Sequence, residues 1–463
     1  MRERWLKYIS FGGFITIITL LIAATILEKF KGSSFVLDNI YHSPYFIILW
    51  GTSAMSAILY IIKAARRPSL LLLHVSLIAI LFGALMSFIT AEHGEMTIAA
   101  DTPPSSMFVD NAGELRKLPF RITLVGTETL CDEESNPVDY IVRASIYYDG
   151  KEEQLSASMN KPIKKVGYTL CIKAHAPDAV SLLVSHDVLG KPITFLGYTM
   201  SVLSFLLLFA DRGTLFRAML RRKNKKKRTT PAANKILSII SALLLIAIGI
   251  AGIVRWYNTS LFPVTNGNEA MIFISWCGFI ITLCLRREGN ASLPSMFFLS
   301  LASLLVALLT RDDSSNVMPI LRTPLLSLHV TCMILSYTLL GFLAINACIA
   351  IFSKKNDKSE IKTVQLATLG RIMLYPATLL LSAGIFIGAV WAEISWGRYW
   401  GWDPKEVWAL ITLLLCSLPF HTKSMPIFSK SINFHYFCLI LFLAMLFTYL
   451  GVNYILGGIH AYL

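Results

Sequence analysis

Long apolar runs alternate with short polar connections along most of the chain. A membrane-spanning helix needs about 20 mostly apolar residues, and eleven stretches approach or reach that length. The pattern therefore predicts a polytopic all-α membrane protein with about eleven transmembrane helices. The eleven stretches are residues 9–27, 45–62, 70–90, 190–209, 235–254, 269–285, 292–310, 326–352, 370–392, 405–420 and 434–452.

One long polar segment, residues 91–189, interrupts this series. Apolar and polar residues alternate in parts of it, as in Arg121–Val125 and Tyr140–Tyr147, which is typical of strands with one buried face. Asp149 and Gly150 form the dipeptide that two-residue hairpin turns favour. A segment of this length is too long for a simple loop, so the sequence predicts one small antiparallel β domain.

The composition supports a membrane protein. Hydrophobic residues make up 55% of the chain and charged residues only 15%, whereas soluble domains carry about 25% charged residues. The net charge of +14 would suggest nucleic acid as a partner for a soluble protein. Here the basic residues fall in short runs between apolar stretches, so we expect the lipid bilayer, and no nucleic acid, as a partner.

The basic clusters predict the orientation in the membrane. If all eleven stretches are spans, every cluster falls on one side, which the positive-inside rule makes cytoplasmic. The N-terminus is then cytoplasmic, and the C-terminus and the β domain are extracytoplasmic. The clusters are Arg2, Arg4 and Lys7; Lys63, Arg66 and Arg67; residues 221–228; Arg286 and Arg287; Lys354, Lys355, Lys358 and Lys362; and Lys423 and Lys430.

The basic run at residues 221–228 also marks the best module boundary. We expect an N-terminal module, residues 1–210, with four spans and the β domain. A basic cytoplasmic linker, residues 211–234, then leads to a second module, residues 235–463, with seven spans and short loops.

The eight cysteines contain no Cys-x-x-Cys pair. Six lie in apolar stretches, where cysteine usually acts as a small buried hydrophobe. Cys131 and Cys171 lie in the polar segment, and whether they form a disulfide stays open because the sequence does not give the geometry.

Four histidines sort into two pairs by their predicted depth. His74 lies near the cytoplasmic start of the third span and His421 at the cytoplasmic end of the tenth. His329 and His460 lie on the outer side, at the start of the eighth span and beyond the eleventh. A span rises about 30 Å, so the pairs cannot share one metal, but each pair can supply two axial ligands to one haem. A hydrogen-bonded packing role remains the alternative for each histidine.

Tryptophan is concentrated in residues 391–408, which contain five of the nine Trp residues of the chain. Tryptophan collects at membrane interfaces without fixed spacing, but here Gly, Asp and Pro accompany it in one compact order. A flat aromatic platform of this kind suits a flat macrocycle. Asp403 can orient the polar edge of such a ligand or cap the helix that begins at Pro404. The order is Trp396-Gly397-Arg398-Tyr399-Trp400-Gly401-Trp402-Asp403-Pro404-Lys405-Glu406.

This segment closely resembles the tryptophan-rich WWD motif of haem-handling proteins, specifically the CcsA (ResC) branch of system II cytochrome c biogenesis. The resemblance covers residues 235–463 almost throughout and includes His329-Val330, Phe420-His421-Thr422 and Gly458-Ile459-His460. The first half more weakly resembles the CcsB (ResB) partner, with three spans, a histidine in the third, an external β region and a fourth span. The whole chain is thus similar to a fused CcsB–CcsA protein, although its external segment is shorter than is usual in that family.

The resemblance implies a cytochrome c synthase of the bacterial inner membrane. It implies an inner transmembrane site with His74 and His421 as axial ligands of haem b. It also implies an external site where His329 and His460 bind haem beside the platform of Trp396, Gly397, Trp400, Trp402 and Asp403. Haem would then be attached by thioether bonds to the Cys-x-x-Cys-His motif of apocytochrome c, with thiol-reducing proteins as further partners. Positioning would suffice for this reaction, so no other catalytic residue is expected.

Three other function classes stay open at this point. A haem transporter or chaperone would move haem without forming a thioether. A b-type dihaem electron-transfer subunit would keep its haems and would not need the Trp-rich segment. A structural assembly factor would bind no haem.

Overall fold

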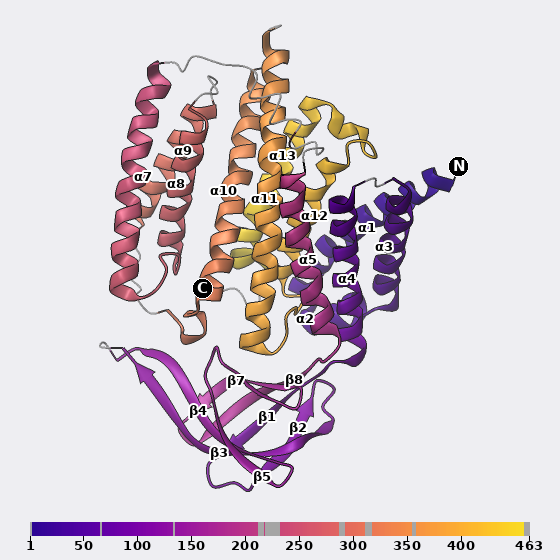
Figure 1. The fold of residues 1–463 in the computed structure, drawn as a ribbon, viewed down its shortest axis with the longest axis vertical. Helices are drawn as coiled ribbons and strands as arrows, with labels where there is room; N and C mark the ends of the chain where they lie inside the picture. The colour runs from indigo at the N-terminus through magenta and orange to yellow at the C-terminus, as the bar shows by residue number, and fades with distance from the viewer. Residues whose placement is uncertain are drawn as a thin grey trace.

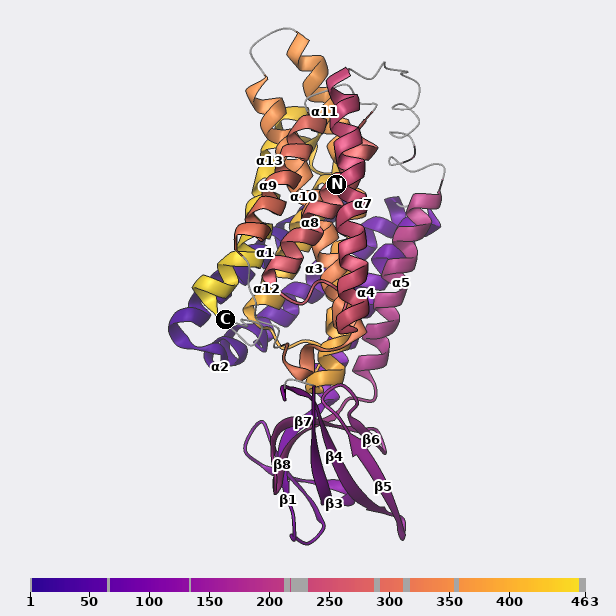
Figure 2. The same cartoon turned by 90° about the vertical axis from the view of Figure 1, so that its left-hand side faces the viewer.

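A helical bundle stands on a β domain, as the computed structural model shows in two perpendicular views (Figures 1 and 2). The structure describes residues 2–64, 67–132, 135–211, 217, 232–286, 292–310, 317–353 and 358–457. His460 and the basic run at 221–228 therefore lie outside the described residues.

The first module consists of four long helices joined by short elements and by the β domain. The helix α4 leads directly into the first strand and α5 follows the last strand, so these two helices connect the β domain to the helical bundle (Figure 1). Its elements are α1 (Arg2–Lys31), α2 (Ser33–Val36), a π-helical turn (Leu37–Tyr41), α3 (Pro44–Ala64), α4 (Pro68–Thr90) and α5 (Gly190–Ala210).

The second module is entirely helical within the described residues. Its elements are α7 (Ala232–Thr259), α8 (Gly267–Cys284), α9 (Ser292–Leu309), α10 (Pro324–Phe352), α11 (Lys358–Trp396), α12 (Pro404–Ser417), α13 (Ser431–Leu446) and a π-helical stretch (Phe447–Leu456). Short 3₁₀ turns cover Pro319–Leu321, Leu418–His421 and Pro426–Ser429.

The polytopic fold class is confirmed. Among the described residues, ten helices are long and apolar enough to cross a membrane. The stretch at 405–420 differs from the other ten because its helix, α12, has only 14 residues. At 1.5 Å per residue it rises about 21 Å, which is less than the hydrocarbon thickness of about 30 Å. It is therefore not among the ten helices of spanning length, and the eleventh predicted span stays a prediction. The Trp-rich segment precedes α12, and the 3₁₀ turn that ends at His421 follows it.

The β domain is one antiparallel sheet, in the strand order β5-β4-β3-β2-β1-β8-β7-β6. The predicted hairpin is confirmed: β4 ends at Tyr148, β5 begins at Lys151, and Asp149 and Gly150 between them have φ values of +53° and +70°. Alternate residues of the strands build the core of the domain. The strands are β1 (Glu92–Ala99), β2 (Ser105–Asp110), β3 (Leu115–Cys131), β4 (Pro137–Tyr148), β5 (Lys151–Ala157), β6 (Ile163–Lys165), β7 (Tyr168–Ala176) and β8 (Ala179–His186).

Cys131 and Cys171 do not form the disulfide that the sequence left open. Cys131 is an exposed free thiol at the end of β3, and Cys171 is a buried free thiol in β7. Strands β2, β1 and β8 stand between their strands in the sheet.

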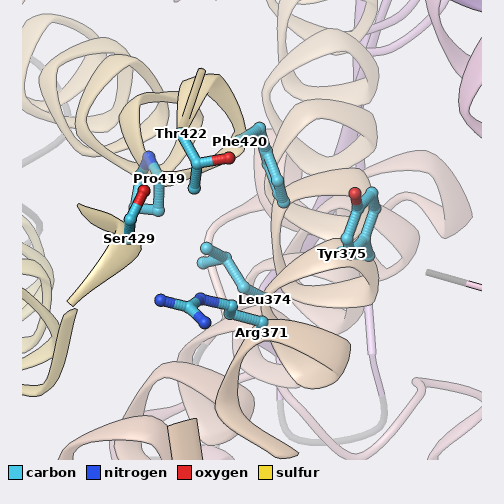
Figure 3. Close-up of a pocket in the computed structure, with 7 residues that line it drawn as sticks. All are labelled: Arg371, Leu374, Tyr375, Pro419, Phe420, Thr422 and Ser429. Carbon is cyan, nitrogen blue, oxygen red and sulfur yellow. The ribbon is translucent and has the colours of Figure 1, made fainter. Parts of the chain in front are cut away.

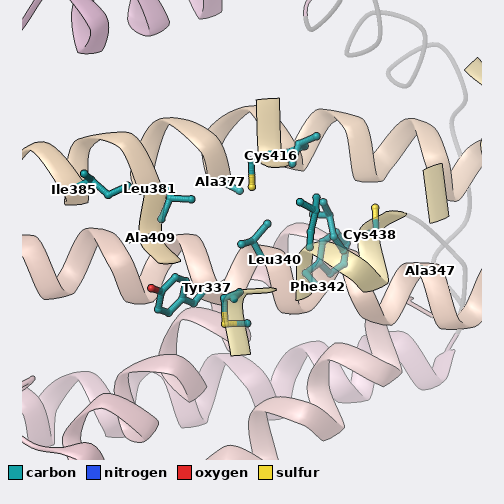
Figure 4. Close-up of a cluster of buried hydrophobic side chains, with 14 of the residues drawn as sticks. Tyr337, Leu340, Phe342, Ala347, Ala377, Leu381, Ile385, Ala409, Cys416 and Cys438 are labelled. Carbon is teal, nitrogen blue, oxygen red and sulfur yellow. The ribbon is translucent and has the colours of Figure 1, made fainter. Parts of the chain in front are cut away.

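The helical core lies where α10, α11, α12 and α13 meet (Figure 4). Leu340, Leu381 and Cys416 are fully buried there. The first module joins this core through α5, since the ring of Tyr198 stacks on Phe386 with centroids 4.3 Å apart. These contacts connect the helices of the first module to the segment after α12. The relative position of His74, on α4, and His421, in that segment, depends on this connection.

Candidate functional site

His74 and His421 lie side by side, although 346 intervening residues separate them in the sequence. His74 is in the second turn of α4, and His421 ends the 3₁₀ turn after α12. Their ring centroids are 6.4 Å apart and their planes are nearly perpendicular, at 82°. The structure therefore brings together, from two modules, the pair that the sequence assigned to the inner site.

The hydrogen bonds of the two rings fix which nitrogen each can offer to a metal. Nδ1 of His74 donates to the carbonyl oxygen of Leu70 at 2.8 Å. Nδ1 of His421 donates to the carbonyl oxygen of Ser417 at 3.0 Å. A carbonyl can only accept, so each Nδ1 carries the proton and each Nε2 keeps its lone pair. Backbone carbonyls orient many metal-binding imidazoles in this way.

The spacing of the two rings fits one metal ion between them. A first-row metal binds imidazole nitrogen at about 2 Å, so two imidazoles on opposite sides of one iron have centroids roughly 6 Å apart. The Phe11 ring from α1 adds an apolar neighbour, with its centroid 5.5 Å from that of His421 at an interplanar angle of 74°. The donor set and its surroundings therefore suit a bis-imidazole haem better than a hydrated ion.

The outer histidine His329 lies in the second turn of α10 and is held from α11. Its Nδ1 donates to the carbonyl oxygen of Gly384 at 2.6 Å. Gly388 makes room for the ring, because a Cβ at this position would come within 2.6 Å of it. Since its predicted partner His460 lies outside the described residues, the outer pair stays a prediction.

The Trp-rich segment, residues 391–408, comprises the end of α11, a connection at residues 397–403 with two left-handed residues, and the start of α12. Gly397 has a φ of +70° directly after the end of α11, and Trp402 has a φ of +57°. Asp403 then caps α12: its carboxylate accepts from the amide of Lys405 at 2.9 Å, and Glu406 accepts from the amide of Asp403 at 3.2 Å. The capping role that the sequence left open for Asp403 is therefore real.

The tryptophan rings of this segment do not lie in one plane. Trp400 and Trp402 are 5.8 Å apart at 90°. Tyr41 of the first module stacks on Trp402 at 4.4 Å and 12°, and Phe46 meets the Trp402 ring edge-on at 5.4 Å. Tyr41 thus covers one face of Trp402. The sequence did not predict this contact, because no local pattern indicates that Tyr41 and Trp402 are neighbours. Trp396 packs against Trp391 at the end of α11.

The β domain packs on the same segment. The thiol of Cys171 donates to the carbonyl oxygen of Ile394 at 3.4 Å, and Ser395 donates to Asn160 at 3.3 Å. A Cβ on Gly397 would lie 3.1 Å from Cβ of Ser185 and 3.6 Å from Sγ of Cys171. Gly397 is therefore required both by its backbone conformation and by the close approach of the sheet.

A buried chain of hydroxyl groups ties the segment to α4. Thr194 donates to the Tyr399 hydroxyl at 3.3 Å, and that hydroxyl is 2.8 Å from Oγ of Ser87. Ser87 in turn donates to the carboxylate of Asp187 at 2.5 Å. Since Ser87 lies on α4, the helix that carries His74 at its other end also anchors the Trp-rich segment.

The packing of Cys171 predicts its reactivity. Burial raises the pKa of its thiol to about 12, so only about one molecule in ten thousand would carry a thiolate at pH 8. We expect a water-soluble maleimide to label Cys131 at pH 8 and to leave Cys171 unmodified. Mass spectrometry of labelled wild type and of a Cys131→Ser variant tests this. Rapid labelling of Cys171 in the folded variant would contradict the docking of the sheet described above.

The helical part of this site lies in a region similar to known proteins. A family model described as "Cytochrome C assembly protein" matches residues 264–460. The match contains His329, the Trp-rich segment and His421, and it leaves out the first four long helices and the β domain.

Relatives from bacteria and an alga agree with this match. Protein NrfI of Wolinella succinogenes is 32% identical over 275 residues, which cover 56% of this chain but only 29% of NrfI. The cytochrome c biogenesis protein CcsA of Chlamydomonas reinhardtii is 30% identical over 252 residues, 50% of this chain and 68% of that protein. CcsA of Prochlorococcus marinus is 26% identical over 313 residues, 60% of this chain and 96% of that protein.

Proposed function

This chain belongs to the cytochrome c assembly family that includes CcsA, and from this premise we propose that it is a cytochrome c synthase. It takes haem b from the cytoplasmic side and exports it through an inner site. It attaches the haem at an outer site to apocytochrome c. The observation that carries the proposal is the His74–His421 pair, whose rings are 6.4 Å apart with both Nδ1 atoms tied to carbonyls.

The proposed orientation places the inner site near the cytoplasm. Basic residues, among them Arg67, precede α4 and mark the cytoplasmic end of that helix. Thr90 at the other end of α4 leads into the β domain, which is then extracytoplasmic. The protein would lie in a bacterial inner membrane with its N-terminus inside and its C-terminus outside.

The first module contributes to both sites, which supports a fused CcsB–CcsA arrangement. His74 provides one ligand to haem at the inner site, and Tyr41 and Ser87 hold the Trp-rich segment at the outer side. At the outer site, His329 and His460 hold haem beside Trp396, Gly397, Trp400, Trp402 and Asp403. Bis-histidine ligation leaves no open position on the iron for dioxygen during transfer.

Thioether formation then needs no oxidant or reductant. Each thiol of the Cys-x-x-Cys-His motif adds across one haem vinyl group: sulfur bonds to one vinyl carbon, and the proton of the thiol ends on the other. The chain's part is to hold vinyl and thiol groups in contact and in the right orientation, which alone can supply much of the rate. Partner proteins that reduce thiols would keep the apocytochrome cysteines free to react.

Co-expression with an apocytochrome c in a host without its own maturation system tests this proposal. We expect covalent haem on the cytochrome, visible by haem staining after denaturing electrophoresis. A His42→Ala variant is the matched control, because His42 is an exposed histidine distant in sequence from both pairs. Haem bound to the membrane protein without covalent product would identify a transporter and contradict the synthase.

A further inference from the structure

A cavity of about 230 Å³ lies between α11 and the chain that follows α12 (Figure 3). Arg371 and Tyr375 line it from α11, and Phe420, Thr422 and Ser429 line it from the opposite side. This volume is below the 300–1,000 Å³ that is usual for whole drug-sized ligands, so the cavity suits one polar substituent of a larger molecule.

Arg371 lines this cavity and forms no ion pair with the residues that the structure describes. Its Nη2 donates to the carbonyl oxygen of Phe428 at 2.5 Å, and its guanidinium lies 4.9 Å from the centre of the Phe434 ring. Its Nε is buried and has no hydrogen-bond partner among the described residues. A partly buried guanidinium in this state is stabilised by an incoming oxyanion, which it can bind through two parallel hydrogen bonds.

The position of the cavity connects it to the inner histidine pair. Its lining residues Phe420 and Thr422 are the two chain neighbours of His421. The Phe420 ring packs on Tyr375 with centroids 4.6 Å apart. The cavity thus flanks the His421 turn, on the side from which haem would enter in the proposed orientation.

We propose that this cavity binds a carboxylate of haem, with Arg371 as the residue that recognises a propionate during entry into the inner site. The hydroxyl groups of Thr422 and Ser429 add donors to the guanidinium, and the rings of Phe420 and Tyr375 give an apolar wall for the edge of the macrocycle. This inference rests on the proposed haem-handling function. A phospholipid headgroup carries the same oxyanion chemistry, so the test separates the two sources.

The test compares two porphyrins that differ only in their carboxylates. Ferric haem and its dimethyl ester are titrated into the purified protein in nanodiscs of phosphatidylcholine, which has no net charge. A hydrogen-bonded charge pair makes a difference of about tenfold or more in affinity. We expect wild type to prefer haem over the diester by about this factor, and Arg371→Gln to bind both nearly equally. Arg371→Lys should keep part of the preference, because lysine keeps the positive charge but lacks the two parallel N–H donors of the guanidinium.

The matched control is Arg286→Gln, which removes an exposed basic residue from the same predicted side of the membrane. This variant should keep the wild-type preference for haem over the diester. The preference is a ratio of two affinities measured on the same variant, so a partly unfolded sample cannot imitate the expected result. An unchanged preference in Arg371→Gln would overturn the inference. Anionic phospholipid that co-purifies with wild type and is lost from Arg371→Gln would then assign the cavity to a lipid headgroup. If wild type binds neither porphyrin, the proposed function fails as well. If Arg371→Gln loses the preference while His421→Ala keeps full haem affinity, the inner-site assignment alone is wrong.

Discussion

Replacing His421 with alanine is expected to remove most of the haem from the inner site. His421 and His74 would bind the same iron from opposite sides, and loss of an orienting residue alone costs about 10- to 100-fold in metal affinity, so loss of a ligand should cost at least as much. Pyridine haemochrome quantitation of the purified protein measures the effect. His74→Ala should give the same loss, although it changes a different module.

The double variant tests whether the two histidines bind the same iron. Two ligands of one iron act as a unit, so His74→Ala combined with His421→Ala should lose scarcely more haem than either single variant. His42→Ala, an exposed histidine of the first module, should retain wild-type haem. Independent, additive losses from the two single variants would contradict a shared iron.

The second large effect is expected from Gly397→Ala at the contact between the Trp-rich segment and the β domain. A Cβ in this left-handed conformation costs roughly 1–2 kcal/mol, and the close contact with Ser185 at 3.1 Å adds to that strain. The sheet must move away from the segment, so the yield of covalent cytochrome c should fall severalfold. Cys171, which also lies against Gly397, should become accessible to maleimide.

Gly113→Ala provides the matched control for this variant. Gly113 has a φ of +83° but nothing within 4 Å of its missing Cβ, so the alanine there introduces backbone strain without a collision. Its yield of covalent cytochrome c should stay close to that of wild type. Equal losses in the two variants would show that the yield follows general stability and would contradict a specific role for the docked sheet.

Features that depend on local sequence were predictable. The Asp149-Gly150 hairpin follows from residues that accept positive φ, and Asp403 with Glu406 carries the spacing of a capping box. The nearness of His74 and His421 was predictable from depth alone, because the topology placed both near the cytoplasmic end of their spans.

Apart from the pairing of His74 and His421, the contacts between distant segments were not predictable. Tyr41 of the first module covers Trp402 of the second. The apolar pattern of the sequence does not indicate which aromatic ring will stack on Trp402. The surroundings of Arg371, a backbone carbonyl and an aromatic ring, likewise come from α13 and the turns after α12. The short α12 was missed because its apolar run continues into a 3₁₀ turn, which hydropathy does not distinguish from helix.

The central claim is that one haem iron lies between His74 and His421, and electron paramagnetic resonance of the ferric protein tests it most directly. The measurement uses a His329→Ala background so that the outer site does not contribute. Since the two imidazole planes are nearly perpendicular, at 82°, a low-spin signal of the highly anisotropic type is predicted, and it should disappear in both His74→Ala and His421→Ala. A high-spin signal, or a low-spin signal that survives either substitution, would contradict the account.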